Sequence, residues 1–214
     1  MKKDESKKTV DFRLIVIAAG HDIIGRPPEE IIEVCCKSGV KAFQLRDKDM
    51  TAGDLLKLAQ ALKKITKKYT ANLIINDRLD IALSSKADGL HSPENGISSK
   101  DVKRIDNKLL LGRSVHLREA AIDAGRSGFD YIIFGPVYRT SSKIKFGKPQ
   151  GLKKLKEVCK AVDIPVFAIG GITPARAKKC IEHGAHGTAV ISAVTRSANI
   201  MRTISEFKRA LGSL

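Results

Sequence analysis

The chain has 214 residues, of which 43% are hydrophobic, and a formal net charge of +16 from 39 basic and 23 acidic residues. This length suits one large α/β domain or two small ones, and no linker divides the chain, so we expect one domain. No apolar stretch reaches the roughly 20 residues that a transmembrane helix needs, so we expect no membrane partner. The basic residues are dispersed and no nucleic-acid-binding signature accompanies them, so we do not expect nucleic acid as the main ligand. The positive field would instead attract anionic substrates.

The start of the chain and its cysteines indicate a cytoplasmic protein. Residues 1–9 are charged and lack the apolar core of a signal peptide. The four cysteines lie in helical patterns without a C-x-x-C pair, which is typical of buried, reduced thiols. We therefore expect a charged tail over 1–9 and a single domain over 10–214. The sequence leaves homo-oligomerisation open.

Short β-rich runs alternate regularly with amphipathic segments along the chain. Strands are predicted at 13–19, 42–45, 72–75, 87–90, 109–112, 130–134, 165–169 and 187–191. Helices are predicted at 28–38, from Thr51 to beyond Ile65, at 78–83, 98–104, 117–126, 152–161, 173–184 and 200–211. Such alternation predicts right-handed βαβ units and a parallel sheet. Eight units match a (β/α)₈ TIM barrel, with a doubly wound open sheet as the alternative.

Most of the predicted strands end in glycines or in small polar clusters. Parallel strands place their carboxyl ends on one rim, where barrels and open sheets of this class bind ligands. One repeated local pattern therefore predicts a single site. The clusters in chain order are Gln44-Leu45-Arg46, Asn76-Asp77-Arg78, His91, Ser114-Val115-His116, Gly135-Pro136, Gly170-Gly171 and Ile191-Ser192.

The glycine pair after the seventh strand predicts a phosphate site. In TIM barrels the loops after strands seven and eight offer backbone N–H groups to phosphate, often with a helix N-terminus. Glycine lets the backbone approach the oxygens closely. Gly170 and Gly171, together with Ile191 and Ser192, have this position. The alternative is that the glycines only form a tight turn.

His116 is the candidate general acid or base, since an imidazole can take and give a proton near neutral pH. The alternative is that His116 caps the following helix. The same argument applies to His91, but less strongly.

Asp77 is the candidate Mg²⁺ ligand, because hard cations prefer carboxylate and phosphate oxygens. Capping of the next helix by Asp77 is an equal alternative, and a second carboxylate would have to come from Glu94 or Asp49.

Gln44 and Arg46 alternate on the second strand and so face the same side. Inside the barrel mouth, Arg46 would hold a phosphate or carboxylate with both guanidinium nitrogens, unless it pairs with Asp47 or Asp49. The loop at 137–150 carries hydroxyls and a lysine that suit a phosphate or pyrophosphate, namely Thr140, Ser142 and Lys143, and its length suits a lid. The alternative is an ordinary basic loop.

From Gln44 to Ser192 these motifs, in this order, resemble the thiamine phosphate synthase family and its sister branch, the TenI-type thiazole tautomerases. The resemblance implies a TIM barrel that binds a phosphorylated thiazole. The residues expected to bind substrate or phosphate are Gln44, Arg46, Asn76, Ser114, Thr140, Ser142, Lys143, Gly170, Gly171, Ile191 and Ser192.

The two branches differ in their chemistry. The synthase branch joins the thiazole phosphate to hydroxymethylpyrimidine pyrophosphate and releases pyrophosphate, with Mg²⁺ held by the Asp of Asn-Asp and by a second Asp after the fourth strand. In this chain the stretch reads His91-Ser92-Pro93-Glu94-Asn95-Gly96, and Gly96 stands where that second carboxylate is expected. The tautomerase branch moves a proton on a thiazole carboxylate phosphate to make the ring aromatic, and needs no metal.

The motif Gly112-Arg113-Ser114-Val115-His116 and the segment from Pro93 to Lys103 are similar to the tautomerase branch, whereas Asp77 fits the synthase. We therefore expect a thiazole tautomerase that uses His116 and no cofactor. The alternative is a thiamine-phosphate synthase with Mg²⁺ at Asp77. A non-catalytic binder of a phosphorylated ligand or of nucleic acid, or a phosphosugar isomerase, remains as a further alternative.

Overall fold

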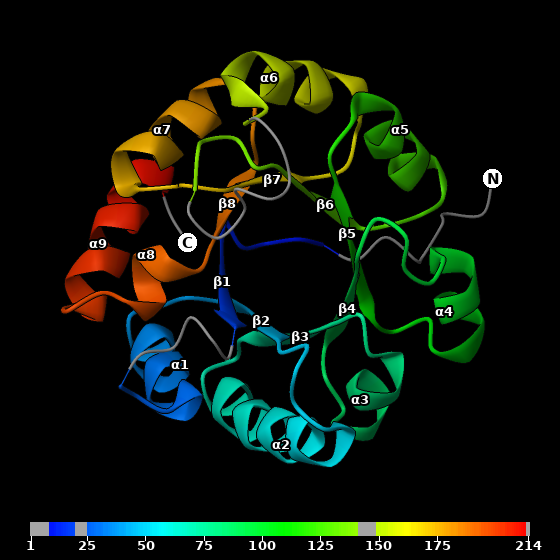
Figure 1. The fold of residues 1–214 in the computed structure, drawn as a ribbon, viewed down its shortest axis with the longest axis vertical. Helices are drawn as coiled ribbons and strands as arrows, with labels where there is room; N and C mark the ends of the chain where they lie inside the picture. The colour runs from blue at the N-terminus through cyan, green and yellow to red at the C-terminus, as the bar shows by residue number, and fades with distance from the viewer. Residues whose placement is uncertain (1–8, 20–24, 141–148, 213–214) are drawn as a thin grey trace.

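The computed structural model describes residues 9–19, 25–140 and 149–212. Eight parallel strands close into a barrel in sequential order, with β1 paired to both β2 and β8 (Figure 1). This closure confirms the single-domain TIM barrel and rejects the open sheet. The strands are β1 Leu14–Ala19, β2 Ala42–Arg46, β3 Asn72–Asn76, β4 Gly89–Ser92, β5 Leu110–Val115, β6 Tyr131–Phe134, β7 Val166–Ile169 and β8 Gly187–Val190.

The helices form a ring around the barrel (Figure 1). They are α1 Pro28–Lys37, α2 Ala52–Lys68, α3 Leu79–Ser84, α4 Ser99–Ile105, α5 Arg118–Arg126, α6 Gly151–Ala161, α7 Pro174–Glu182, α8 Ser192–Thr195 and α9 Ile200–Leu211. Eight of them match predicted segments. The short α8 was missed, since four residues carry no periodicity that a sequence can reveal. The charged tail predicted at 1–9 lies outside the described residues except for Thr9.

Local signals in the sequence account for several helix starts. The side chain of Thr51 accepts a hydrogen bond from the backbone N–H of Asp54 at 3.3 Å and so caps α2, as predicted. Thr173 caps α7 in the same way, and Pro174 occupies the first turn, where its missing N–H costs nothing. These caps set the points at which the chain leaves the barrel rim and turns back along the outside.

Two hydrophobic clusters build the domain. The larger one lies between the strands and the surrounding helices. The smaller one fills the barrel interior with inward-facing residues, among them Ile17, Ile74, Leu110, Tyr131 and Phe167. Because side chains alternate along a strand, the register with these residues identifies every other inward position. The interior is therefore a packed core that closes the barrel below its polar rim.

Two aspartates tie neighbouring strands at their amino ends. The carboxylate of Asp88, just before β4, accepts the backbone N–H of Leu73 at 2.8 Å and the ammonium of Lys63 at 2.5 Å. Asp130, just before β6, accepts the backbone N–H of Leu111 at 2.7 Å. These bonds connect β3 with β4 and β5 with β6, and so place the carboxyl ends of those strands relative to one another.

None of the described helices is long and apolar enough to cross a membrane. All four cysteines are free thiols, and Cys35, Cys36 and Cys180 are buried. Burial raises the pKa of each of these three thiols to about 12. The expectation of buried, reduced cysteines is confirmed for these three, whereas Cys159 is half-buried.

Candidate functional site

Polar side chains of β2, β3, β4 and β5 face the barrel interior at its carboxyl rim. Gln44 is in register with Ile17 and Ile74, which belong to the interior cluster, so Gln44 also points inward. Arg46 follows two residues later on the same side. Asn76 is paired with His91. The preceding pair, Ile75 and Leu90, belongs to the outer cluster, so Asn76 and His91 face the interior. The structure thus gathers these predicted residues at one rim.

Gln44 is a buried amide with an unsatisfied donor. Its side chain is 2% exposed, and its Nε2 has no hydrogen-bond partner within the described residues. A buried amide without a partner costs free energy, so such a group marks a position where a ligand or water completes the site. Asp47, the expected alternative partner of Arg46, instead accepts the backbone N–H groups of Asp49 and Met50 at 3.0 Å.

Asp77 lies directly after β3 and has a left-handed backbone, with φ of 66°. Its N–H donates to the carbonyl of His91 at 2.9 Å, and its side chain is exposed. The N-cap residue of α3 is Arg78, without a side-chain capping bond, so the capping alternative for Asp77 is wrong. Asp and Asn adopt this region of φ more readily than most side chains, so the turn after β3 suits an aspartate at this position.

The donor set around Asp77 is small. Within the described residues, no group of three or more His, Cys, Asp or Glu side chains is placed to hold a metal ion. Gly96 supplies no ligand, and the turn in which it lies has the backbone bond from its N–H to the carbonyl of Pro93 at 2.9 Å. One carboxylate fits Mg²⁺ that arrives with substrate phosphates, and does not form a site made of protein ligands alone.

His91 is buried, and both of its ring nitrogens have hydrogen-bond partners, which the sequence did not indicate. Its ring is 2% exposed, with Nε2 at 2.8 Å from Oγ of Ser114 and Nδ1 at 3.3 Å from the hydroxyl of Tyr131. Gly112 makes this arrangement possible, because a Cβ atom there would lie 2.1 Å from Cζ of Tyr131 and 2.6 Å from Nδ1 of His91. The predicted ligand residue Ser114 is therefore held from below by a buried histidine.

His116 follows β5 and is half-buried at the rim. Its Nδ1 makes a short hydrogen bond to the carbonyl oxygen of Gly135, and its backbone N–H donates to Oε1 of Glu94 at 3.4 Å. The carbonyl can only accept, so the proton lies on Nδ1 and Nε2 of the neutral ring is an acceptor. The N-cap residue of α5 is Leu117, so the capping alternative for His116 is wrong.

The loops after β7 and β8 enclose a cavity of about 60 Å³. This space suits a compact group such as a phosphate. Ser192 and Ala193 begin α8, so their N–H groups have no partner inside the helix. The cavity brings together five predicted residues with five neighbours: Thr140, Ile169, Gly170, Gly171, Ile172, Ala189, Val190, Ile191, Ser192 and Ala193.

The glycine pair at this cavity is fixed by its backbone and by an arginine. Gly170 and Gly171 have φ of 100° and 62°, a region that L side chains rarely adopt. Arg176 of α7 donates to the carbonyl of Gly171 at 2.7 Å, and its guanidinium stacks 4.7 Å from the ring centroid of Tyr138. Nothing in the sequence marks Arg176 and Tyr138 as site residues, because their contact with the glycines depends on how α7 folds back.

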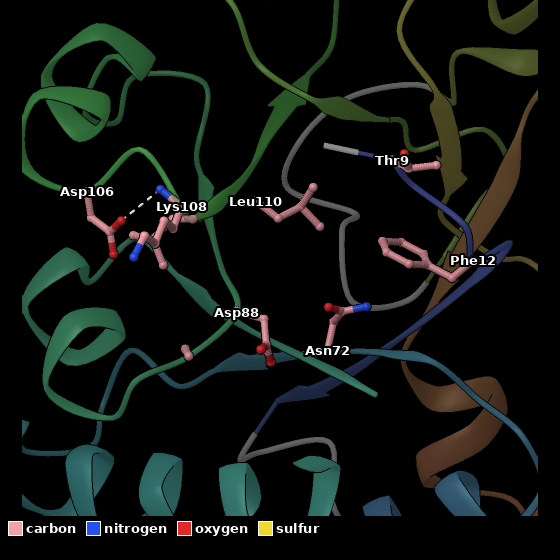
Figure 2. Close-up of a pocket in the computed structure, with 9 residues that line it drawn as sticks. Thr9, Phe12, Asn72, Asp88, Asp106, Lys108 and Leu110 are labelled. Carbon is pink, nitrogen blue, oxygen red and sulfur yellow. Dashed lines mark hydrogen bonds between the residues drawn. The ribbon is translucent and has the colours of Figure 1, made fainter. Parts of the chain in front are cut away.

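A larger cavity of about 350 Å³ lies at the opposite, amino-terminal end of the barrel (Figure 2). Both of its carboxylates already have protein partners: Asp88 binds Lys63 and the N–H of Leu73, and Oδ1 of Asp106 accepts the N–H of Lys108 at 2.7 Å. Residues at this face of TIM barrels serve stability. We therefore place the functional site at the carboxyl rim, despite the smaller cavity there.

Of the residues predicted to bind substrate or phosphate, nine lie at the carboxyl rim and two, Ser142 and Lys143, lie outside the described residues. The nine fall into two groups. One group surrounds the cavity of the β7 and β8 loops, and the other lines the mouth over β2, β3 and β5. A closed barrel with a polar mouth and a glycine-lined cavity at the same rim belongs to the class of (β/α)₈ enzymes whose active site lies at the carboxyl ends of the strands.

Within this class, the chain belongs to the thiamine monophosphate synthase family, whose profile, TMP-TENI, matches residues 14–194. A thiamine-phosphate synthase of Roseiflexus castenholzii is 43% identical over 77% of this chain and 73% of its own. A Geobacter sulfurreducens protein, provisionally named a thiamine-phosphate synthase, is 42% identical over 86% of this chain and 87% of its own.

A solved structure agrees with the family assignment. The thiamine phosphate pyrophosphorylase of Pyrococcus furiosus superimposes with a TM-score of 0.85 and is 29% identical, covering 94% of this chain and 96% of that one. These relatives carry synthase names and none is named a tautomerase, which favours the alternative from the sequence over the tautomerase. The expected membership of the wider family is confirmed.

Proposed function

We propose that this protein is a thiamine-phosphate synthase, which joins a phosphorylated thiazole to hydroxymethylpyrimidine pyrophosphate and releases pyrophosphate. The observation that carries the proposal is that one rim holds two separate groups of polar residues, each of which could hold one of the two substrates. The cavity beside Gly171 and Ser192 suits the single phosphate of the thiazole. The mouth over β2 and β3, with Arg46 and Asp77, suits the second substrate. The synthase names of the relatives support the same activity.

In this reaction a bond forms between the ring nitrogen of the thiazole and the methylene carbon of the hydroxymethylpyrimidine. The bond from that carbon to the diphosphate oxygen breaks, and its electron pair leaves on the diphosphate. The chain must therefore hold both rings in contact and stabilise the departing charge. Backbone N–H groups at the start of α8 would anchor the thiazole phosphate. Arg46 would pair with a diphosphate oxygen, and the unpartnered Nε2 of Gln44 would donate to the pyrimidine ring in the barrel mouth.

Asp77 would hold Mg²⁺ together with the diphosphate, since one carboxylate plus substrate phosphates is a common Mg²⁺ donor set. When bound, the cation would neutralise part of the charge that develops on the leaving diphosphate. Gly96 leaves this site with a single carboxylate, so we expect the Mg²⁺ affinity to depend on the bound diphosphate.

The test is an assay with thiazole phosphate and hydroxymethylpyrimidine pyrophosphate, with and without Mg²⁺, that measures thiamine phosphate and pyrophosphate. We expect both products in equal amounts, and only with Mg²⁺. Asp77→Asn should reduce turnover, and added Mg²⁺ should partly restore it, whereas the Asp106→Asn control at the opposite barrel end should leave turnover unchanged. Absence of both products at saturating Mg²⁺ would overturn the proposal.

Thiazole tautomerase activity is the second candidate, and one specific observation favours it. The bond from Nδ1 of His116 to the Gly135 carbonyl leaves Nε2 available as a proton acceptor at the rim. The same assay distinguishes this candidate, because a tautomerase would convert thiazole carboxylate phosphate to its aromatic isomer without Mg²⁺ and without the pyrimidine substrate.

A further inference from the structure

A buried chain of three side chains runs from the barrel core to the rim. It begins at the hydroxyl of Tyr131 on β6, passes 3.3 Å to Nδ1 of His91 on β4, and continues 2.8 Å from Nε2 to Oγ of Ser114 on β5. Tyr131 and His91 are 0% and 2% exposed, and Ser114 is half-buried at the mouth. The chain therefore links a deeply buried donor to a hydroxyl that a ligand can reach.

The direction of the hydrogen bonds follows from the environment of Tyr131. Its ring packs against Phe12 and Phe167, with centroid distances of 6.4 and 5.6 Å. Within the described residues, the Tyr131 hydroxyl has one hydrogen-bond partner, Nδ1 of His91. Burial raises the pKa of Tyr131 far above its usual value, so the phenol keeps its proton. A buried O–H without an acceptor is costly, so this proton must point at Nδ1.

The remaining directions are then determined. Nδ1 accepts from Tyr131, so the neutral imidazole carries its proton on Nε2. Nε2 donates to Oγ of Ser114, and the serine hydrogen is left to point away from His91. The opposite polarity, in which Ser114 donates to His91, would make the serine a base-activated hydroxyl and would leave the Tyr131 proton facing phenyl rings.

We propose that Tyr131 and His91 are positioning residues that fix Ser114 as a hydrogen-bond donor to an acceptor atom of the ligand, a ring nitrogen or a phosphate oxygen. The identity of that ligand rests on the function proposed above, whereas the direction of the chain does not. Gly112 is part of the device, because any Cβ atom there would push the Tyr131 and His91 rings apart. In this proposal His91 acts through Ser114.

The first test measures the tautomer directly by ¹⁵N NMR of the imidazoles near neutral pH, with the His91 signals assigned by their loss in His91→Gln. We expect a protonated Nε2 and an unprotonated Nδ1 in the wild-type protein. Tyr131→Phe keeps the ring packing but removes the donor to Nδ1, so it should yield a mixture of tautomers. A wild-type ring protonated on Nδ1, or on both nitrogens, would overturn the proposal.

The second test is a double-mutant cycle in the synthase assay. His91→Leu should lower kcat by about 10-fold, the effect of losing one well-placed hydrogen bond. His91→Gln, whose amide nitrogen can replace Nε2 as a donor, should recover most of that loss. In the Ser114→Ala background His91→Leu should have little further effect, because its role is exerted through Ser114. Circular dichroism and the unfolding midpoint confirm that each variant folds.

The outcomes separate the two proposals. A persistent 10-fold loss from His91→Leu in the Ser114→Ala background overturns the positioning role, and so does failure of His91→Gln to recover activity while the fold is intact. If the wild-type protein makes no thiamine phosphate, the proposed function fails, and the NMR tautomer alone decides the direction of the chain.

Discussion

A Cβ atom on Gly96 would lie 2.7 Å from Cδ and 3.0 Å from Cγ of Pro93, so the turn after β4 has no space for a side chain at position 96. The N–H of Gly96 donates to the carbonyl of Pro93, which closes this turn. The geometry of this turn therefore excludes a second carboxylate at position 96. Restoring it requires a change at Pro93 as well.

Gly96→Asp should lower the free energy of unfolding by about 1–3 kcal/mol, the usual cost of forcing atoms into a packed site. Pro93→Ala removes Cδ and Cγ, so Gly96→Asp should cost less in that background. Urea unfolding of the two single variants and the double variant measures the difference. Equal costs of Gly96→Asp in both backgrounds would show that Pro93 is not the obstacle.

Gly171→Ala should weaken binding of the phosphorylated thiazole. The position has φ of 62°, and a Cβ atom would lie 2.6 Å from the carbonyl oxygen of Arg139. The loop must then move away from the cavity, and we expect KM to rise about tenfold or more, equivalent to about 1.4 kcal/mol of lost binding.

Gly151→Ala is the matched control for Gly171→Ala. Gly151 has φ of 76°, and a Cβ atom there would meet nothing within 4 Å. Its cost is backbone strain alone, about 1–2 kcal/mol of stability, with KM unchanged. A similar KM in both glycine variants would remove Gly171 from the phosphate site.

The fold was predictable because it depends on local signals that repeat. Apolar runs marked the strands, and Thr51 and Thr173 marked helix starts that the structure confirms. The position of the rim follows from parallel strands alone, so residues as distant in sequence as Gln44 and Ser192 could be assigned to one end of the barrel. Their roles as ligand-binding residues stay predictions.

Side-chain contacts between neighbouring strands could not be predicted from the sequence. The roles of His91 and Tyr131 depend on the register of β4, β5 and β6, which places Gly112 between them. The engagement of Arg176 with Gly171 depends on the path of α7. Whether Asp77 caps a helix is also a question of backbone geometry, because the left-handed φ at this residue shifts the cap to Arg78.

His116→Asn distinguishes the two candidate activities. The Asn amide can still donate to the Gly135 carbonyl in place of Nδ1, but the acceptor at Nε2 is lost. Tautomerase turnover should fall by roughly 10²–10⁴-fold, the usual contribution of a general acid or base. Synthase turnover should change by less than about 10-fold, since no step assigned to His116 occurs in it. Unchanged turnover in both assays would remove His116 from either mechanism.

The buried thiols should make the protein less stable at high pH. Burial raises the pKa of Cys35 from 9.0 to about 12, and that of Cys36 and Cys180 likewise. Above pH 9 the unfolded chain loses these protons while the folded protein retains them, so the free energy of unfolding should fall between about pH 9 and 12. Urea unfolding across this range measures the slope.

Cys35→Ala is the variant that tests this assignment, because it removes one of the shifted groups from a helix that tolerates alanine. Its unfolding free energy should depend less steeply on pH above 9 than that of the wild-type protein, whatever its stability at pH 7.

Cys159 is half-buried, and burial raises its pKa to about 11. In the folded protein it should react with iodoacetamide before the other three thiols. Labelling of Cys35 before Cys159, or the same pH dependence of unfolding in the wild-type protein and in Cys35→Ala, would contradict the burial of the Cys35 thiol.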